Sequence, residues 1–140
     1  MANFPYYGLE VEFSPNSKRK KVVWRPIIEI ILLSGRKFIS HPVLIDSGSD
    51  YNILDFEIAS VFGLKLAKGK MRKIYGIGNQ AIKTYEHSIQ IKIPGFETYV
   101  ADVLFAKLPG HTLGVLGNSG FFNKFTVEFD YKRKAIEINE

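Results

Sequence analysis

Short strand-like segments separated by turn residues make up almost the whole sequence, and this pattern constrains the fold more than any other feature. The most apolar segment, residues 27–33, is typical of a strand that is buried on both faces. Only residues 55–62 carry clear helix signals, with Asp55 as the N-cap, Glu57 in the first turn and Gly63 as the stop. We therefore predict an all-β fold, a closed or nearly closed barrel with one or two short helices.

The chain is expected to form a single domain that spans residues 1–140. Residues 1–24 are predicted to form an N-terminal extension hairpin, and residues 131–140 a closing C-terminal arm. Further strands are expected at residues 38–45, 72–75, 81–85, 88–93, 96–105, 113–117, 126–129 and 135–138, and one helical turn at residues 120–125.

The chain contains no cysteine, which excludes disulfides, thiolate catalysis and cysteine metal sites and is compatible with a cytoplasmic location. Its formal net charge is +5, with a basic run at residues 18–21. No recognition helix and no mixture of aromatic and basic residues accompanies these charges, so we expect solvated loops and no nucleic-acid partner. No apolar run is long enough to span a bilayer, and the N-terminal residues lack the pattern of a signal peptide. No membrane association is expected.

An acid follows directly after an apolar strand in residues 44–50, Leu-Ile-Asp-Ser-Gly-Ser-Asp. A carboxylate at this place stays ionised only if neighbouring donors hold it, which makes Asp46 a candidate for chemistry. Asp, Ser and Gly are also the residues of ordinary turns, so a plain turn explains the stretch equally well. The stretch by itself leaves both interpretations open.

Other kinds of site have less support in the sequence. The three histidines, His41, His87 and His111, are isolated from one another and from acids at ligand spacing, so neither a metal site nor a cofactor is expected. Gly76 and Gly78 lie on a predicted hairpin, whereas a nucleotide site needs glycines in front of a helix. Serine catalysis requires a histidine partner, and the serines of the acidic stretch lie beside an acid instead.

Several segments together resemble the retropepsins, the retroviral-type aspartic proteases and their cellular relatives. Residues 44–49 match the apolar-apolar-Asp-Thr/Ser-Gly-Ala/Ser signature of that family, and Arg25-Pro26 with its apolar strand stands before it as in the viral enzymes. Residues 75–79 (Tyr-Gly-Ile-Gly-Asn) are similar to the family's glycine-rich flap tip. Residues 115–117 (Val-Leu-Gly), with 120–122, look like the strand and short helix behind the catalytic loop. The resemblance covers residues 24–129 and implies the retropepsin barrel with a flap hairpin.

The resemblance implies an aspartic endopeptidase that acts as a homodimer on a peptide or protein substrate. The chain supplies one Asp-Ser-Gly motif, whereas the family's chemistry needs two aspartates that share a water, so Asp46 would face its symmetry mate across a two-fold interface. The two carboxylates would share one proton and titrate as a unit. The ionised carboxylate would take a proton from the attacking water and the protonated one would support the peptide carbonyl oxygen, as in other aspartic proteases.

The same resemblance assigns roles around Asp46. Ser47 would hydrogen-bond across the dyad to the opposite loop, Gly48 would let the backbone approach the carboxylates, and Ser49 would border Asp46. Gly76, Ile77 and Gly78 would form a flap that closes over substrate and excludes water. Ile53, Leu113 and Val115 match pocket-lining positions of the family, although plain core packing explains these apolar residues equally well. The implied substrate-binding residues are Asp50, Ile53, Tyr75, Gly76, Ile77, Gly78, Leu113 and Val115.

Departures from the viral pattern limit what carries over. Where the viral enzymes have an arginine directly after the apolar-apolar-Gly strand, this chain has Asn118. Arg25 remains in the place of a second arginine, so Asp50 is expected to pair with Arg25 of the partner subunit. The chain is longer at both ends than the viral enzymes, which leaves the construction of its dimer interface open. The helix at residues 55–62 is more similar to cellular members of the family.

Two other classes of function remain open from the sequence. One is a catalytically silent barrel of the same fold that binds peptides or serves as a scaffold, because a monomer would carry only half of a site. The other is a basic nucleic-acid-binding barrel, which rests on the net charge alone.

Overall fold

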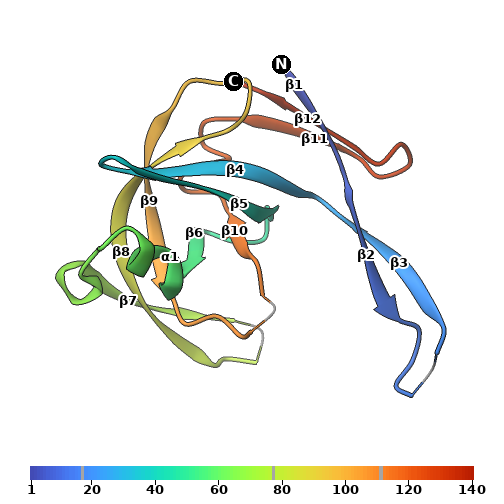
Figure 1. The fold of residues 1–140 in the computed structure, drawn as a ribbon, viewed down its shortest axis with the longest axis horizontal. Coiled ribbons are helices and arrows are strands. Elements are labelled where there is room, and N and C mark those ends of the chain that lie inside the picture. The colour runs from blue at the N-terminus through green and yellow to red at the C-terminus, as the bar shows by residue number, and fades with distance from the viewer. Residues whose placement is uncertain (17, 77, 111) are drawn as a thin grey trace.

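The structure is a computed structural model that describes residues 1–16, 18–76, 78–110 and 112–140. Strands dominate, with one short α-helix and one turn of 3-10 helix (Figure 1). The elements are β1 (Ala2–Pro5), β2 (Tyr7–Glu12), β3 (Lys20–Arg25), β4 (Ile27–Ser34), β5 (Lys37–Ile45), β6 (Asn52–Asp55), α1 (Phe56–Val61), η1 (Leu66–Lys68), β7 (Lys70–Tyr75), β8 (Ala81–Lys92), β9 (Tyr99–Ala106), β10 (Gly114–Leu116), β11 (Thr126–Asp130) and β12 (Ala135–Asn139).

Six strands close into a ring. The large sheet runs in the order β4-β5-β10-β6-β9-β8-β7, and a further pairing of β4 with β8, from Ile31↔Lys92 to Leu33↔Gln90, joins its two sides. Strand β7 lies outside the ring because it pairs only with the first half of β8. The predicted all-β barrel with short helices is confirmed, and β7 and β8 form a hairpin that projects from it.

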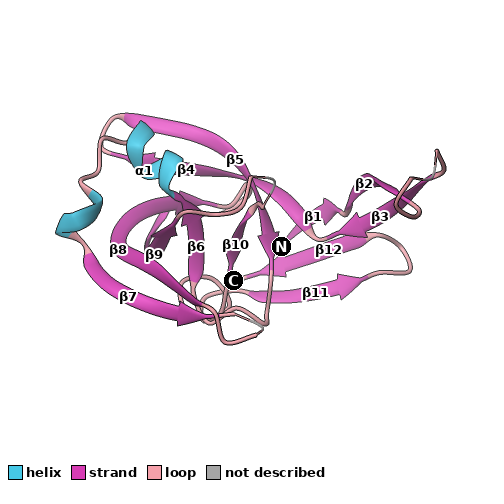
Figure 2. Cartoon of the chain, turned by 90° about the horizontal axis from the view of Figure 1, so that it is seen from below, coloured by secondary structure: helices cyan, strands magenta, loops and turns pink. Residues whose placement is uncertain are grey.

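Two smaller sheets extend the ring (Figure 2). Strand β1 pairs with β12, and β12 with β11, so the first and last strands of the chain lie side by side. Strands β2 and β3 pair only with each other, as a hairpin that projects away from the rest of the molecule. The N-terminal segment is therefore divided between two sheets.

The core lies inside the ring and extends beneath the β1-β12-β11 sheet. Both faces of β4 are largely covered apart from Glu29, as its nearly continuous apolar sequence indicated, whereas β12 buries alternate residues. The largest fully buried side chains are Phe105, Phe121, Ile30, Leu32, Leu54, Ile91, Ile93, Leu104, Leu116, Ile136, Ile138 and Val43. Because these side chains come from most strands of the ring and from β12, the core fixes the strand ends where the acidic stretch lies.

The N-cap and stop signals in the sequence correctly predicted where α1 begins and ends. Asp55 has extended backbone angles, and its side chain accepts a hydrogen bond from Glu57 N at 2.9 Å, which satisfies one of the free donors of the first turn. The helix ends before Gly63, whose φ of +68° is the left-handed conformation that glycine adopts without strain. The predicted helix over residues 55–62 is thus present as α1 with its two caps.

Two expected boundaries were wrong. The strands predicted at residues 81–85 and 88–93 are one continuous strand, β8, because its middle residues pair with β7 on one side and with β9 on the other. The helical turn predicted at residues 120–125 is present only as a single turn at its end, where Phe125 N donates to Phe121 O, four residues back, at 3.0 Å. Gly120 has a φ of +106°, outside the helical region, and Phe122 N donates to Gly117 O, five residues back, at 3.1 Å.

His41 on β5 makes the stability of the fold depend on pH. Burial lowers the pKa of His41 below its usual value, while Glu29 and Asp55 act weakly in the opposite direction. The unfolded chain therefore takes up a proton before the folded chain does, so this contribution to stability is complete above the unfolded pKa and is lost as the pH falls. We expect the His41→Gln variant to lose less free energy of unfolding than wild type between pH 7.5 and 5.5 in urea titrations. Equal losses would contradict the assignment.

Candidate active site

Asp46 lies where three strands of the ring meet. Ile45, the last residue of β5, donates its backbone N–H to Pro26 O at 2.9 Å, at the start of β4. Asp46 N donates to Leu116 O of β10 at 3.0 Å. These two bonds fix the backbone on both sides of the residue, so the position of the carboxyl group is set by the barrel and not by a free loop.

The turn after β5 holds the Asp46 side chain by a backbone donor. Gly48 N donates to Asp46 Oδ1 at 2.9 Å, and Ser49 N closes the turn by donating to Asp46 O at 3.1 Å. A Cβ atom at Gly48 would lie 3.1 Å from Asp46 Oδ1, closer than most side chains tolerate, so glycine allows this approach. Asp46 is half-buried, and within the described chain no cationic side chain forms an ion pair with it.

A second loop, directly after β10, is locked to the first. Asn118 N donates to Ser49 O at 2.8 Å, and Ser119 N donates to Asp50 O at 2.9 Å. Tyr51 forms an isolated parallel bridge with Ser119. The two loops therefore form one unit, and the second loop supports the backbone that carries Asp46.

Asn52 links the two loops through its buried side chain, and it is not among the site residues predicted from the sequence. Its side chain is fully buried, and Asn52 Oδ1 accepts a hydrogen bond from Gly117 N at 3.0 Å. A Cβ atom at Gly117 would lie 2.4 Å from Tyr51 O and 2.5 Å from Ser49 O, so only glycine fits. An amide residue directly before the apolar pair Ile53-Leu54 was the one signal of Asn52 in the sequence.

A cleft of about 580 Å³ opens beside Asp46. It lies between the acidic turn, β6, the segment that leads into β10, and the β7–β8 hairpin. Of the residues that the sequence proposed, the cleft is lined by Asp46, Gly48, Ser49, Asp50, Ile53, Tyr75, Gly76, Leu113 and Val115. Residues that are far apart in the chain are thus brought to one place around the acid.

Two proposed residues, Ser47 and Gly78, are not among those that line the cleft. Ser47 is exposed, and its hydroxyl forms no hydrogen bond with any other described residue. Gly78 lies near the tip of the β7–β8 hairpin, where its φ of +92° favours glycine. Ile77, between Gly76 and Gly78, lies outside the described residues.

The cleft also contains residues that the sequence analysis did not select: Tyr51, Lys73, Ile74, Ile82, Leu108 and Thr112. Ile74 and Ile82 are direct partners across the hairpin, so they cover the same face of it. The alternation of the two strands was the signal that would have found this pair. Lys73 adds one positive charge to a cleft that carries Asp46 and Asp50.

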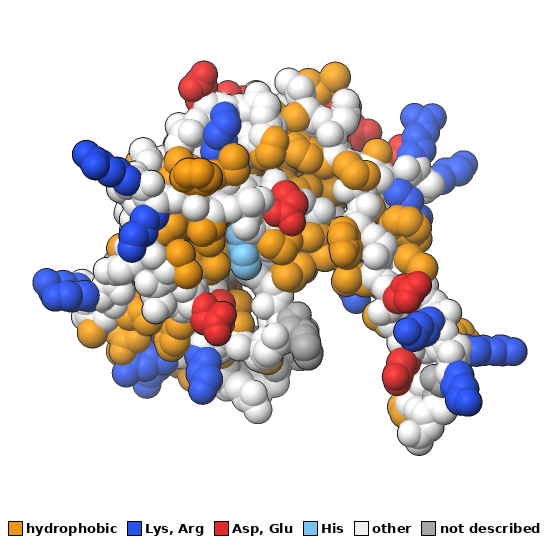
Figure 3. All heavy atoms as spheres, in the orientation of Figure 1, with side chains coloured by type: hydrophobic (Ala, Val, Ile, Leu, Met, Phe, Trp, Pro, Cys, Tyr) orange, Lys and Arg blue, Asp and Glu red, His pale blue; other side chains and the backbone are white. Residues whose placement is uncertain are grey.

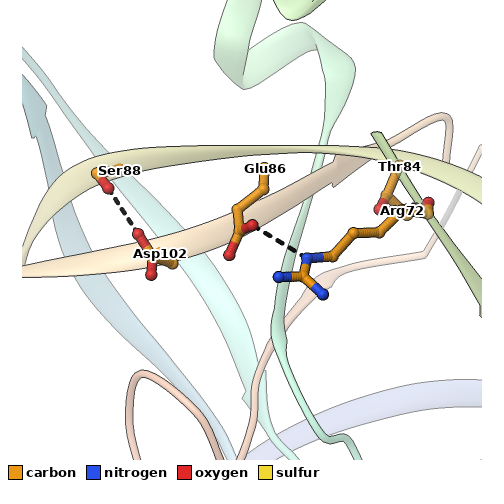
Figure 4. Close-up of polar contacts among 5 residues, drawn as sticks. All are labelled: Arg72, Thr84, Glu86, Ser88 and Asp102. Atoms are coloured by element: carbon orange, nitrogen blue, oxygen red, sulfur yellow. Dashed lines mark hydrogen bonds and ion pairs between the residues drawn. The ribbon is translucent and has the colours of Figure 1, made fainter. Parts of the chain in front are cut away.

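A row of polar contacts runs from the base of the hairpin to β9 (Figure 4), on the face of β7 and β8 that also carries Ile74 and Ile82. Arg72 Nε donates to Glu86 Oε2 at 3.0 Å, and this bond raises the pKa of Arg72. Ser88 Oγ donates to Asp102 Oδ1 at 2.6 Å. Thr84, which is fully buried, donates its hydroxyl to Arg72 O at 2.9 Å. These contacts tie the base of the hairpin to the ring.

Asp50 and Arg25 do not pair within one chain. Both side chains are exposed, and no ion pair of either one occurs among the described residues. Asn118, in the place of the viral arginine, takes part in the loop contact through its backbone and not through a charge.

The described residues contain no group of three or more His, Asp or Glu side chains placed to hold a metal ion. Among the helices of the described residues, none combines the length and the apolar character needed to cross a membrane.

Solved structures with the same architecture identify the fold. The chain is similar to a retropepsin-like aspartic protease from Rickettsia conorii, with a TM-score of 0.61 and 15% identity over 99% of this chain and 93% of that one. It is also similar to EIAV protease complexed with the inhibitor HBY-793, with a TM-score of 0.52 and 20% identity over 75% and 88% of the two chains. The chain has the retropepsin fold. A third similar structure is the retroviral protease-like domain of Ddi1 from Leishmania major, with a TM-score of 0.51 and 14% identity over 81% and 89%.

At these identities the comparisons establish the retropepsin fold alone. No protein-family model and no curated protein sequence matches the chain. The predicted resemblance to retropepsins is confirmed at the level of the fold, and the roles of individual residues rest on the geometry around Asp46.

Proposed function

We propose that the protein is an aspartic endopeptidase whose active site forms from two copies of the chain. The observation that carries this proposal is the position of Asp46, half-buried beside an open cleft, at the strand end that a retropepsin fold uses for its motif. One chain contributes one Asp-Ser-Gly turn to the cleft, so a second copy related by a two-fold axis would supply the other carboxylate. Residues 1–140 would act as one catalytic domain in the cytoplasm.

The chemistry is hydrolysis of a peptide bond by an activated water. With one proton shared by Asp46 and Asp46 of the partner subunit, the ionised carboxylate removes a proton from the water as its oxygen attacks the carbonyl carbon. The protonated carboxyl donates its hydrogen to the carbonyl oxygen. The tetrahedral intermediate then collapses: the carboxyl that took the proton of the water gives it to the leaving amine, the carbon–nitrogen bond breaks, and the other carboxylate takes back a hydroxyl proton as the carbonyl re-forms. No cofactor or metal enters these steps.

Neighbouring groups would prepare the site for this reaction. Gly48 N, which donates to Asp46 Oδ1 at 2.9 Å, holds the carboxyl group in a fixed orientation. Ser47, exposed and without a partner in the described chain, would bond with the turn of the second copy. The β7–β8 hairpin would act as the flap, with Ile74 and Ile82 as its apolar inner pair against substrate.

Arg25→Ala is expected to weaken the dimer. In the proposal Arg25 pairs with Asp50 of the partner subunit, and both charges are unpaired within the described part of one chain. Loss of one partner of such a pair would raise the dissociation constant of the dimer by about tenfold or more, as measured by sedimentation equilibrium. Arg36→Ala, a change of an exposed arginine in the turn between β4 and β5, is the matched control. An unchanged dissociation constant for Arg25→Ala would rule out this ion pair.

The endopeptidase activity is tested with a mixed peptide pool. Wild type and the Asp46→Asn variant are incubated with the pool between pH 4 and 8, and new termini are identified by mass spectrometry. Cleavage by wild type alone, greatest at mildly acid pH, is the expected result. Cleavage by both proteins would point to a contaminant, and cleavage by neither would favour a silent barrel that binds peptides or serves as a scaffold.

A further inference from the structure

The β2–β3 hairpin has almost no support from the rest of the chain. Its two strands pair only with each other, and two-stranded hairpins are at best marginally stable alone in water. Near its base, Lys134 Nζ lies 6.0 Å from the Trp24 ring centroid and 3.5 Å from that of Tyr131. Beyond this point the hairpin projects freely in both views (Figures 1 and 2). A projecting hairpin of this kind needs a contact that one chain does not provide.

One face of this hairpin carries five apolar side chains together with Lys21 and Arg25. We call it the inner face, and its apolar side chains are Tyr7, Leu9, Val11, Phe13 and Val23. The strand register places Leu9 opposite Val23 and Val11 opposite Lys21, so these side chains share one side. Tyr7 is 55% exposed and Phe13 60% exposed. The opposite face carries Glu10, Glu12 and Lys20 along with Val22 and Trp24.

The inner face continues into the candidate active site. At the base of the hairpin, Tyr7 and Leu9 line a mostly apolar groove of about 320 Å³ together with Ile28, Pro42 and Leu113. Leu113 also lines the cleft beside Asp46. The space-filling view shows an open notch between the projecting hairpin and the body (Figure 3). A molecule that covers the inner face therefore lies next to the cleft.

Charges on the two sides of the notch are complementary. The inner face of the hairpin carries Lys21 and Arg25, neither of which forms an ion pair within the described chain. On the body, Glu29 lines the groove and Asp50 lines the cleft, and these acids are likewise without an ion pair among the described residues. A second copy of the chain offers both signs at the matching places, because a two-fold contact places each hairpin against the partner's body.

We propose that each β2–β3 hairpin docks its inner face on a second copy of the chain and so clasps the dimer beside the shared cleft. This inference rests on the proposed function, since a site with one Asp46 is incomplete without that copy. In the dimer, the partner subunit would cover the inner face of the hairpin and the groove at its base. The two-fold axis would make this contact occur twice. Dimer formation and assembly of the active site would then be one event.

The test compares changes on the two faces of the hairpin. The double variant Val11→Ser/Phe13→Ser alters the inner face, and Val22→Ser makes the same kind of change at a 48% exposed position on the opposite face. We expect the double variant to raise the dimer dissociation constant at least about tenfold in sedimentation equilibrium, with cleavage recovering at high protein concentration. Val22→Ser should stay within about threefold of wild type.

Hydrogen exchange of the wild-type protein tests the same contact without relying on a variant that folds correctly. Amide hydrogen exchange of residues 7–25 is followed above and below the dissociation constant, and the clasp predicts protection of β2 and β3 that is lost on dilution. Equal exchange at both concentrations would overturn the clasp while leaving the dimer in place. A raised KM with unchanged dimerisation in the double variant would assign the inner face to peptide substrate instead. A wild type that is monomeric and inactive would overturn both the clasp and the proposed function.

Discussion

Asp46→Asn is expected to lower kcat/KM for peptide cleavage by roughly 10³-fold or more, because both carboxylates of the proposed pair are lost and an amide cannot accept the proton of the attacking water. The fold should persist. Asp46 accepts one described side-chain bond, from Gly48 N at 2.9 Å, and the carbonyl oxygen of an asparagine can accept the same bond. Steady-state kinetics together with a thermal melt separate loss of chemistry from loss of structure.

Glu128→Gln is the matched control for this prediction. Glu128 is an exposed residue of β11 that does not line the cleft, and the change likewise replaces a carboxylate by an amide. Its kcat/KM and melting temperature should equal those of wild type. If Asp46→Asn kept the cleavage rate of Glu128→Gln, Asp46 would not be the catalytic acid.

Gly117→Ala is expected to produce the second large effect, a loss of about 3 kcal/mol or more in the free energy of unfolding. The added Cβ would lie 2.4 Å from Tyr51 O and 2.5 Å from Ser49 O, and both contacts are with backbone that cannot turn away. Relief of the clash would move the loop that accepts the Asn118 N–H bond, so the turn that carries Asp46 would shift as well. Urea unfolding measures the loss of stability, and peptide cleavage should fall with it.

Gly110→Ala provides the comparison for this second variant. A Cβ atom at Gly110 meets no atom within 4 Å, so its alanine variant should keep the stability of wild type within about 0.5 kcal/mol. Equal stabilities of Gly117→Ala and Gly110→Ala would mean that the two loops are not locked as described.

Local patterns predicted much of the fold and the position of the acid at the end of a buried strand. The caps of α1, the buried character of β4 and the acid at the end of β5 are all encoded by residues close together in the chain. The resemblance of the motif segments then placed Asp46, Ile53 and Val115 beside one another, and the cleft contains all three.

Contacts between distant segments could not be predicted in the same way. The pairing of β4 with β8 closes the ring, yet nothing in either strand alone specifies its partner. Asn52 is a polar residue at the start of the short strand β6, and its bond to Gly117 becomes visible only when the two loops meet. The continuity of β8 likewise depends on having partners on both sides, β7 and β9.

The central claim is that two chains share one active site, and subunit mixing tests it most directly. Wild type and Asp46→Asn are mixed in equal amounts at a fixed total concentration well above the dimer dissociation constant, allowed to exchange subunits, and assayed for peptide cleavage. If both copies of Asp46 are required, only dimers of two wild-type chains act, and the rate is about one quarter of that of wild type alone. A rate of about one half would mean that each chain acts independently and would contradict the shared site.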